Sequence, residues 1–355
     1  MVTSRSFSRR LPRVAAAAAA LTLGVAASAY AQAAVSQPTV VTSARVGQGI
    51  YEIVASDALD TIYVASTGVG HVKIFGLDPK TLAVKTTIDT AAAPAYGLGL
   101  NNKTQTLYTS NTRVGSASAI ALKTGTVVNT IKTEADPRAH TYRVLVDEDA
   151  NMTYISLAQA PGKVWVIDGK TNQLAATIDN VGERTTGLAL DKAANKLYVS
   201  SLGTNEIVVV DLATRQVTAR YPSGGERTTQ LAFDPKTRRL FATNQGSGDI
   251  SVLDMNTGAV IKTVKTGAGA LGIGYHQKAN QIYVANRQAG TVTVIDGSTY
   301  AVVADLKAGT LPNTVLVDNR TGFVYVTNKA RGGRGRGAAA ETPDEGGDTV
   351  TLIKP

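Results

Sequence analysis

Short apolar segments alternate with turn residues along the chain from about residue 39 onward, and they recur at a nearly constant interval. Each recurrence is marked by an aromatic residue among apolar neighbours. The intervals between these positions are 45, 46, 44, 43, 42 and 42 residues. The seven aromatic positions are Tyr63, Tyr108, Tyr154, Tyr198, Phe241, Tyr283 and Tyr325. Such a period indicates repeated copies of one supersecondary unit.

Each copy contains four β-type segments separated by turns. An alternating segment such as residues 187–191 ends at an Asp, a second segment carries the aromatic residue, and a third, such as 207–211, again ends in Asp. A fourth, such as 259–264, follows a turn like Asn256-Thr257-Gly258. Four antiparallel strands in this length form one propeller blade. The sequence therefore predicts an all-β fold, a seven-bladed β-propeller of four-stranded antiparallel blades.

The ends of the repeat region predict how the ring closes. The seventh copy supplies strands around Val315 and Tyr325 and a third at 349–353, but no fourth. Residues 39–46 resemble the fourth strands of the other copies, so we expect this N-terminal strand to complete the last blade and to remove exposed edges. Residues 34–355 are thus expected to form a single propeller domain, with a disordered insertion at about 330–347.

The first 33 residues have the organisation of a secretory signal peptide. A basic stretch precedes an apolar run from Val14 to about Ala29, and small residues place cleavage near Ala31 or Ala33. The run is shorter than the ~20 residues of a membrane-spanning helix, so no span is expected after cleavage. This predicts a periplasmic protein. The pair Arg9-Arg10 leaves twin-arginine export open as an alternative to general secretion.

Composition and charge narrow the possible chemistry. The chain has 36 Lys and Arg against 27 Asp and Glu, a formal charge of +9. Four of the positive charges precede Val14, which leaves 32 against 27 in the mature protein and only a modest basic character. The chain has no cysteine. Cysteine nucleophiles, iron–sulfur clusters and thiolate zinc sites are therefore excluded.

Several segments carry a family resemblance. Tyr325-Val326-Thr327-Asn328, and nearly so residues 283–286, resemble the strand endings of YVTN-repeat propellers. Four further segments resemble the YncE-type periplasmic propellers: residues 46–52, 101–107, 186–191 and 287–292. This resemblance implies a secreted seven-bladed propeller with no established enzymatic reaction and a proposed capacity to bind DNA, chiefly single-stranded. It supplies no catalytic motif.

Two neighbouring copies place arginines at the same point of the repeat. Residues 182–186 and 225–229 are both Gly-Glu-Arg-Thr-Thr, so Arg184 and Arg227 are expected side by side on one rim. Six further residues of loops on that face would extend a basic collar suited to phosphate contacts: Arg113, Arg138, His140, Arg287, Lys329 and Arg331. The alternative is that Glu183 and Glu226 hold the neighbouring arginines in blade-to-blade ion pairs.

Aromatic residues on the same loops are candidates for stacking on bases. Tyr51, Tyr96 and Tyr142 precede or begin first strands on the candidate face, where single-stranded nucleic acid needs stacking platforms. Trp165 stands at a third-strand position and is expected to pack between blades. The Arg-Gly segment 331–337 looks like an RNA-binding motif, but its loop carries four basic and four acidic residues. That loop could be a disordered insertion or an electrostatic hook.

No sequence motif indicates catalysis or a cofactor. His71, His140 and His276 fall in different copies without metal-ligand spacing, and one Trp cannot supply the recurring motif of quinone-cofactor propellers. The recurring Asp residues are expected to form turn hydrogen bonds. We therefore expect no enzyme activity, no metal and no cofactor, and a monomer. The two functions left open are single-stranded DNA binding and a protein–protein interaction scaffold of the cell envelope.

Overall fold

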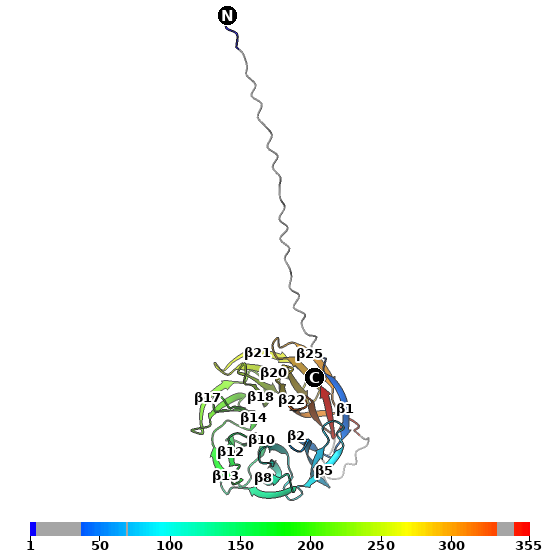
Figure 1. The fold of residues 1–355 in the computed structure, drawn as a ribbon. Coiled ribbons are helices and arrows are strands. Elements are labelled where there is room, and N and C mark those ends of the chain that lie inside the picture. The colour runs from blue at the N-terminus through cyan, green and yellow to red at the C-terminus, as the bar shows by residue number, and fades with distance from the viewer. Residues whose placement is uncertain (5–36, 69, 332–343) are drawn as a thin grey trace. The chain divides into compact units, whose positions relative to one another are not determined.

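Seven four-stranded antiparallel sheets are arranged around a central axis in the computed structural model (Figure 1). The structure describes residues 1–4, 37–68, 70–331 and 344–355. The predicted signal peptide and most of the predicted insertion lie outside these residues. The seven-bladed propeller predicted from the 42- to 46-residue period is confirmed.

In each blade the strands lie side by side from the central channel to the outer rim of the disc. Blade 1 consists of β2 (Ile50–Ser56), β3 (Thr61–Gly68), β4 (His71–Leu77) and β5 (Val84–Asp89). Blade 2 consists of β6 (Gly97–Asn101), β7 (Thr106–Asn111), β8 (Ser116–Ala121) and β9 (Thr126–Ile131), with the short 3-10 helix η1 (Thr112–Val114) after β7. Blade 3 consists of β10 (Thr141–Asp147), β11 (Met152–Leu157), β12 (Lys163–Asp168) and β13 (Gln173–Ile178).

The remaining blades repeat this order. Blade 4 consists of β14 (Thr185–Asp191), β15 (Lys196–Ser201), β16 (Glu206–Asp211) and β17 (Gln216–Pro222). Blade 5 consists of β18 (Thr228–Asp234), β19 (Arg239–Asn244), β20 (Asp249–Asp254) and β21 (Ala259–Lys265). Blade 6 consists of β22 (Ala270–His276), β23 (Gln281–Asn286), β24 (Thr291–Asp296) and β25 (Val302–Lys307). Blade 7 consists of β26 (Leu311–Val317), β27 (Val324–Lys329), β28 (Thr349–Lys354) and β1 (Thr39–Arg45).

The ring closes through strands from the two ends of the chain. β1 pairs antiparallel with β28 from Thr39 opposite Lys354 to Arg45 opposite Thr349. The prediction that residues 39–46 complete the last blade is therefore confirmed. The side chain of Asp348 adds a second connection to blade 1, because its Oδ1 accepts a hydrogen bond from the Gly49 N–H at 2.9 Å.

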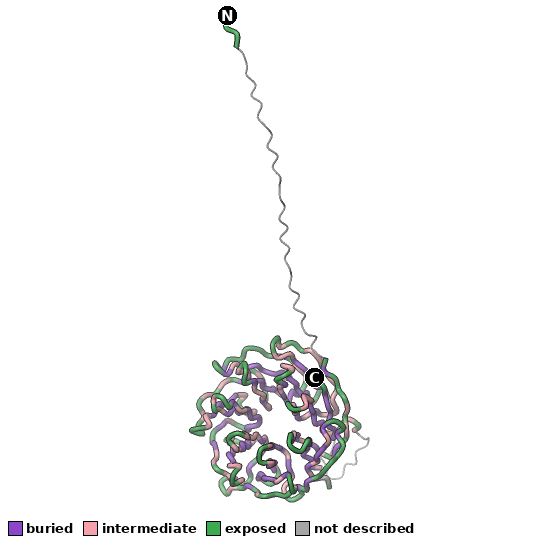
Figure 2. The backbone as a smooth tube through the Cα atoms, viewed as in Figure 1, coloured by how far each residue is buried: buried purple, intermediate pink, exposed green. Residues whose placement is uncertain are grey.

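The hydrophobic core lies between neighbouring blades rather than within them. The repeat aromatics Tyr108, Tyr198, Tyr283 and Tyr325 are almost completely buried there, and exposed backbone follows the outer rim of the disc (Figure 2). Trp165 is fully buried against residues of blade 2, such as Tyr108, as expected for packing between blades. This burial of large rings stabilises each interface.

Asparagines at the ends of second strands fix the loops that follow them. The Asn244 Nδ2 donates to Asp249 Oδ1 and to Ser251 Oγ, both at 2.9 Å. Asn111, Asn286 and Asn328 make corresponding bonds to the third strands of their own blades. The loops after these asparagines, which carry several of the predicted basic residues, therefore begin from a rigid point.

The recurring Asp residues also act as expected, on the opposite face of the disc. Asp211 Oδ1 accepts the N–H groups of Ala213 and Thr214, and the same turn geometry recurs at Asp168, Asp254 and Asp296. These carboxylates are engaged in backbone hydrogen bonds. They are turn residues, as the sequence predicted.

Candidate functional site at the mouth of the channel

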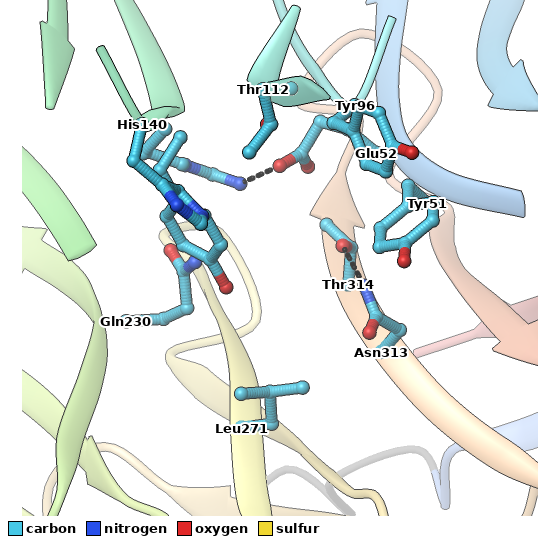
Figure 3. A pocket seen from close by; sticks show the side chains of 12 residues that line it. Tyr51, Glu52, Tyr96, Thr112, His140, Gln230, Leu271, Asn313 and Thr314 are labelled. Atoms are coloured by element: carbon cyan, nitrogen blue, oxygen red, sulfur yellow. Dashed lines mark hydrogen bonds and ion pairs between the residues drawn. The ribbon is translucent and has the colours of Figure 1, made fainter. Parts of the chain in front are cut away.

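The first residues of the inner strands surround a pocket at one end of the central channel (Figure 3). The pocket has a volume of about 180 Å³ and takes side chains from six of the seven blades. Its lining residues are Tyr51, Glu52, Tyr96, Gly97, Thr112, His140, Tyr142, Arg143, Gln230, Leu271, Asn313 and Thr314. A concave site of mixed polar and aromatic lining is a natural candidate for ligand binding.

The three predicted stacking residues lie together in this pocket. On each inner strand, one residue pairs with the residue that directly follows the repeat aromatic of the second strand. Tyr51, Tyr96 and Tyr142 each stand two positions before this pairing inner-strand residue. They therefore form an arc over blades 1, 2 and 3, which we call the tyrosine arc. All three are half-buried, and the rings of Tyr51 and Tyr96 meet edge to face with centroids 4.8 Å apart. The other four blades have Thr186, Thr229, Leu271 and Asn313 at this position.

Cations from the loops after second strands lie on the tyrosine arc. The Nζ of Lys329 is 3.0 Å from the ring centroid of Tyr51, and the guanidinium carbon of Arg113 is 5.7 Å from that of Tyr96. Both contacts place positive charge against the electron-rich face of a ring. The Nη1 of Arg287 donates to Asn313 Oδ1, another lining residue. With His140, which lines the pocket, four residues of the predicted basic collar thus border it.

An ion pair between Glu52 and Arg143 forms the inner wall of the pocket (Figure 3). It joins blades 1 and 3 and passes over blade 2, where Gly97 has no side chain. A Cβ at Gly97 would lie only 2.2 Å from the carbonyl oxygen of Tyr142, so the glycine is required for this close approach. Glu52 is 7 % exposed. Burial, and then the charge of Glu52, raise the pKa of the Tyr142 hydroxyl, which is therefore protonated at neutral pH.

A second series of basic residues occupies one position of the repeat in blades 3, 4 and 5. His140, Arg184 and Arg227 each precede the pairing inner-strand residue by four positions. Arg184 and Arg227 adopt left-handed backbone angles, with φ of 53° and 54°. The Arg184 N–H donates to the Gln159 carbonyl at 2.8 Å, and the Arg227 N–H to Asn205 Oδ1 at 2.6 Å. Each residue is thus anchored to the preceding blade, while its side chain is exposed.

The charges of this series interact with one another. Partial burial of the ring, and then the charge of Arg184, lower the pKa of His140. In the described part of the chain, neither Arg184 nor Arg227 forms an ion pair, and neither do Glu183 and Glu226. The alternative of blade-to-blade ion pairs at this position is therefore wrong for these residues.

Arg184 and Arg227 are not among the residues that line the pocket, and the collar residues Arg138 and Arg331 also lie outside it. Arg138 belongs to the loop before β10, where its backbone packs beside Gly115, and its side chain is exposed. Arg331 is exposed and its N–H donates to Asp344 Oδ2 at 2.7 Å. Neither residue lines the channel mouth. The Arg-Gly segment beyond Arg331 lies outside the described residues.

Sequence reasoning missed the polar residues inside the channel, chiefly Glu52, Arg143 and Gln230. All three stand one residue before the pairing inner-strand position, where other blades have glycine or threonine. Aligning the inner strands by this position would have identified them as an irregularity of the repeat. Their mutual contacts could not have been inferred, because the Glu52–Arg143 pair spans two blade periods.

The described residues contain no group of three or more His, Asp or Glu side chains placed to hold a metal ion. Among the same residues, no helix has the length and apolar character needed to cross a membrane.

The fold and the channel mouth define a seven-bladed β-propeller with a loop-built pocket on its axis. No protein-family model matches the chain. Over 166 residues the chain is 34 % identical to the uncharacterized protein YncE of Salmonella typhi and 32 % identical to the YncE protein of Escherichia coli strain K12. The match covers 44 % of this chain and 47 % of each relative, about half of their length. The protein is thus a propeller with distant homology to YncE.

Proposed function

We propose that this protein is exported, acts as a monomer and has no enzymatic activity. Its ligand is single-stranded nucleic acid, DNA in particular, which binds at the channel mouth. The observation that carries this proposal is the tyrosine arc with Lys329 and Arg113 against its rings. Export to the periplasm is supported by the organisation of residues 1–33. The separation of His71, His140 and His276 over three blades supports a role without catalysis.

The arrangement favours a single strand over a duplex. Bases can stack on tyrosine rings only when they are splayed out of a helix, and such stacking contributes about 1–3 kcal/mol per base. Lys329 and Arg113 each lie over one face of a ring, so a stacking base takes the other face or displaces the cation toward its phosphate. We expect the bases to contact the tyrosine arc and the backbone to follow His140, Arg184 and Arg227. Arg184 and Arg227, and His140 once bound phosphate favours its protonated form, contact phosphate without reading sequence.

A double variant tests whether this rim binds the strand. Arg184→Ala with Arg227→Ala should weaken binding of a labelled single-stranded oligonucleotide roughly tenfold, because two phosphate contacts are removed. The matched control is Lys80→Ala with Lys236→Ala, which removes the same charge from exposed turn residues of the opposite face. Equal affinity of the rim variant and the wild type would show that the rim is not the site. Equal losses in both double variants would show a response to net charge alone.

A second function, an interaction scaffold of the cell envelope, is favoured by the apolar rim of the disc. Large apolar side chains are exposed on fourth strands of five blades: Val40, Val41, Val84, Val127, Val128, Val260, Ile261 and Val302. Exposed outer strands with apolar residues are typical of surfaces that pair with other proteins. Crosslinking in intact periplasm would recover such a partner. Recovery of a partner together with no oligonucleotide binding at physiological salt would favour this second function.

A further inference from the structure

A second cavity lies between blades 3 and 4, at the end of the disc opposite the tyrosine arc. It has a volume of about 250 Å³ and is bordered by the turns after β10, β14 and β16. The inner strands begin at the channel mouth, so these turns lie on the opposite face. The lining residues are Asp147, Ala150, Met152, Tyr154, Val166, Asn195, Leu212 and Arg215.

The cavity arises from an irregularity at one position of the repeat. The turn between the third and fourth strands of blades 1 to 6 contains one residue with positive φ: Leu82, Gly125, Asn172, Arg215, Gly258 and Tyr300. At five of these positions the blade interface is filled. Leu82 is 2 % exposed, and Tyr300 packs into the core between blades 5 and 6. Asn172 bonds to Tyr108, while Ile88 and Tyr221 approach the two glycines from the preceding blade.

Arg215 does not fill its interface. Its side chain is exposed, and the interface beneath it, between blades 3 and 4, is left open as the cavity. Asn172, one blade earlier, closes its interface with a short amide side chain. Arg215 instead places a long cationic side chain at the edge of the cavity.

Three polar side chains of this cavity have no hydrogen-bond or ion-pair partner among the described residues: Tyr154, Asn195 and Arg215. Tyr154 is 4 % exposed as a residue, and its hydroxyl borders the cavity, where solvent reaches it. The corresponding hydroxyls of Tyr108, Tyr198, Tyr283 and Tyr325 donate hydrogen bonds, to Asn172, Asp191, Gln281 and the Pro79 carbonyl. The hydroxyl of Tyr63, like that of Tyr154, has no such partner among the described residues, but Tyr63 does not line this cavity. A hydroxyl at the cavity without a partner in the protein can donate a hydrogen bond to a ligand there.

We propose that this cavity binds a small carboxylate with a branched apolar body. Met152, Val166 and Leu212 offer apolar contacts for the body, and the Arg215 guanidinium and Tyr154 hydroxyl donate to the carboxylate. Asp147 also lines the cavity, but its Oδ1 already accepts the N–H groups of Asp149 and Ala150 and lies 3.5 Å from Lys192 Nζ. These contacts offset part of its negative charge, although Lys192 is shared with Asp149 and the remaining charge still acts on Tyr154.

The Tyr154 hydroxyl is suited to act as a donor. Burial, and then the charge of Asp147, raise its pKa to about 12, so it keeps its proton at neutral pH. This cavity is separate from the channel mouth, and the proposal does not depend on nucleic-acid binding.

Titration with 4-methylpentanoate, and with its uncharged amide as a matched probe, tests the proposal. We expect saturable one-to-one binding of the acid by calorimetry, and at least tenfold weaker binding of the amide, because only the acid can pair with Arg215. With methyl-labelled methionine, the NMR signal of Met152 should shift and that of Met255 should not. Absence of saturable binding of the acid, or equal affinity for the amide, would overturn the proposal.

Substitutions locate the site independently of the probe. Arg215→Leu places at this turn the residue that fills the interface in blade 1, so it should abolish binding. Tyr154→Phe should weaken binding about fivefold through loss of one hydrogen bond. Lys170→Ala, an exposed cation of the turn in blade 3, is the control and should bind like wild type. If Arg215→Leu does not fold, Arg215→Asn serves instead. Unchanged binding by the folded Arg215 variant would contradict the proposed site.

Discussion

His140 differs from the other basic residues of the channel mouth because it can lose its charge near neutral pH. It shares its repeat position with Arg184 and Arg227, yet partial burial and the charge of Arg184 lower its pKa below the ordinary 6.5. The free protein therefore holds His140 mostly neutral at pH 7. A bound phosphate would favour the protonated ring.

This coupling predicts a pH-dependent affinity for oligonucleotide. Binding that raises the pKa of His140 takes up a proton, so affinity should rise as pH falls through the bound-state pKa and level off below the lowered free-state pKa. Titrations between about pH 8 and 5.5 should show this rise in the wild type. His140→Gln should reduce it. The same pH dependence in the variant would mean that another group is responsible.

The lone tryptophan gives a second prediction at the residue scale. Trp165 is fully buried between blades 2 and 3, so Trp165→Ala would leave a large cavity and should lower the free energy of unfolding by about 3–5 kcal/mol. Urea denaturation followed by circular dichroism measures this change. A loss below about 1 kcal/mol would show that neighbouring side chains collapse into the space.

At the scale of elements, most of the fold could be predicted from the sequence repeat. The aromatic period predicted all seven blades, and the missing fourth strand of the last copy predicted β1 in blade 7. The three residues of the tyrosine arc were predicted to share one face from their positions in the loops alone. The Glu52–Arg143 pair and the open interface beneath Arg215 could not be predicted, because each depends on a side chain that is missing or turned away in a neighbouring blade.

The closing strand should be essential to stability. Removing residues 1–45 deletes β1 and exposes the edge of β28, so we expect a melting temperature lower by roughly 10 °C or more and aggregation through the open edge. A protein that begins at residue 37 is the control, because it keeps β1. Equal melting temperatures for the two proteins would contradict the closure of the ring by this strand.

At the scale of the whole molecule, ion pairs connect blades on the face opposite the tyrosine arc. The carboxylate of Asp149 in blade 3 forms ion pairs with Lys103 Nζ of blade 2 at 2.5 Å and with Lys192 Nζ of blade 4 at 2.6 Å. Arg320 of blade 7 pairs with Asp60 of blade 1 near the closure. The disc is thus held by apolar interfaces between blades, by charge pairs between turns on this face and by the Glu52–Arg143 pair at the channel mouth.

Acid should remove the contribution of Asp149. Its hydrogen bonds to Lys103 and Lys192 lower its pKa from 3.8 to about 2. A carboxylate with a lowered folded-state pKa stabilises the protein above pH 3.8, and this effect is lost as pH falls towards 2. Asp149→Asn should therefore melt slightly below the wild type at pH 7 and together with it near pH 2. A difference that persists at the lowest pH would contradict this assignment.

The most direct test of the central claim is a salt series with a labelled single-stranded oligonucleotide and its duplex. If the channel mouth binds single strands, the logarithm of the affinity should fall linearly with the logarithm of salt concentration, by about 0.7 per phosphate contacted, and the single strand should bind more tightly than the duplex. Absence of saturable binding at low salt, or tighter binding of the duplex, would contradict the account.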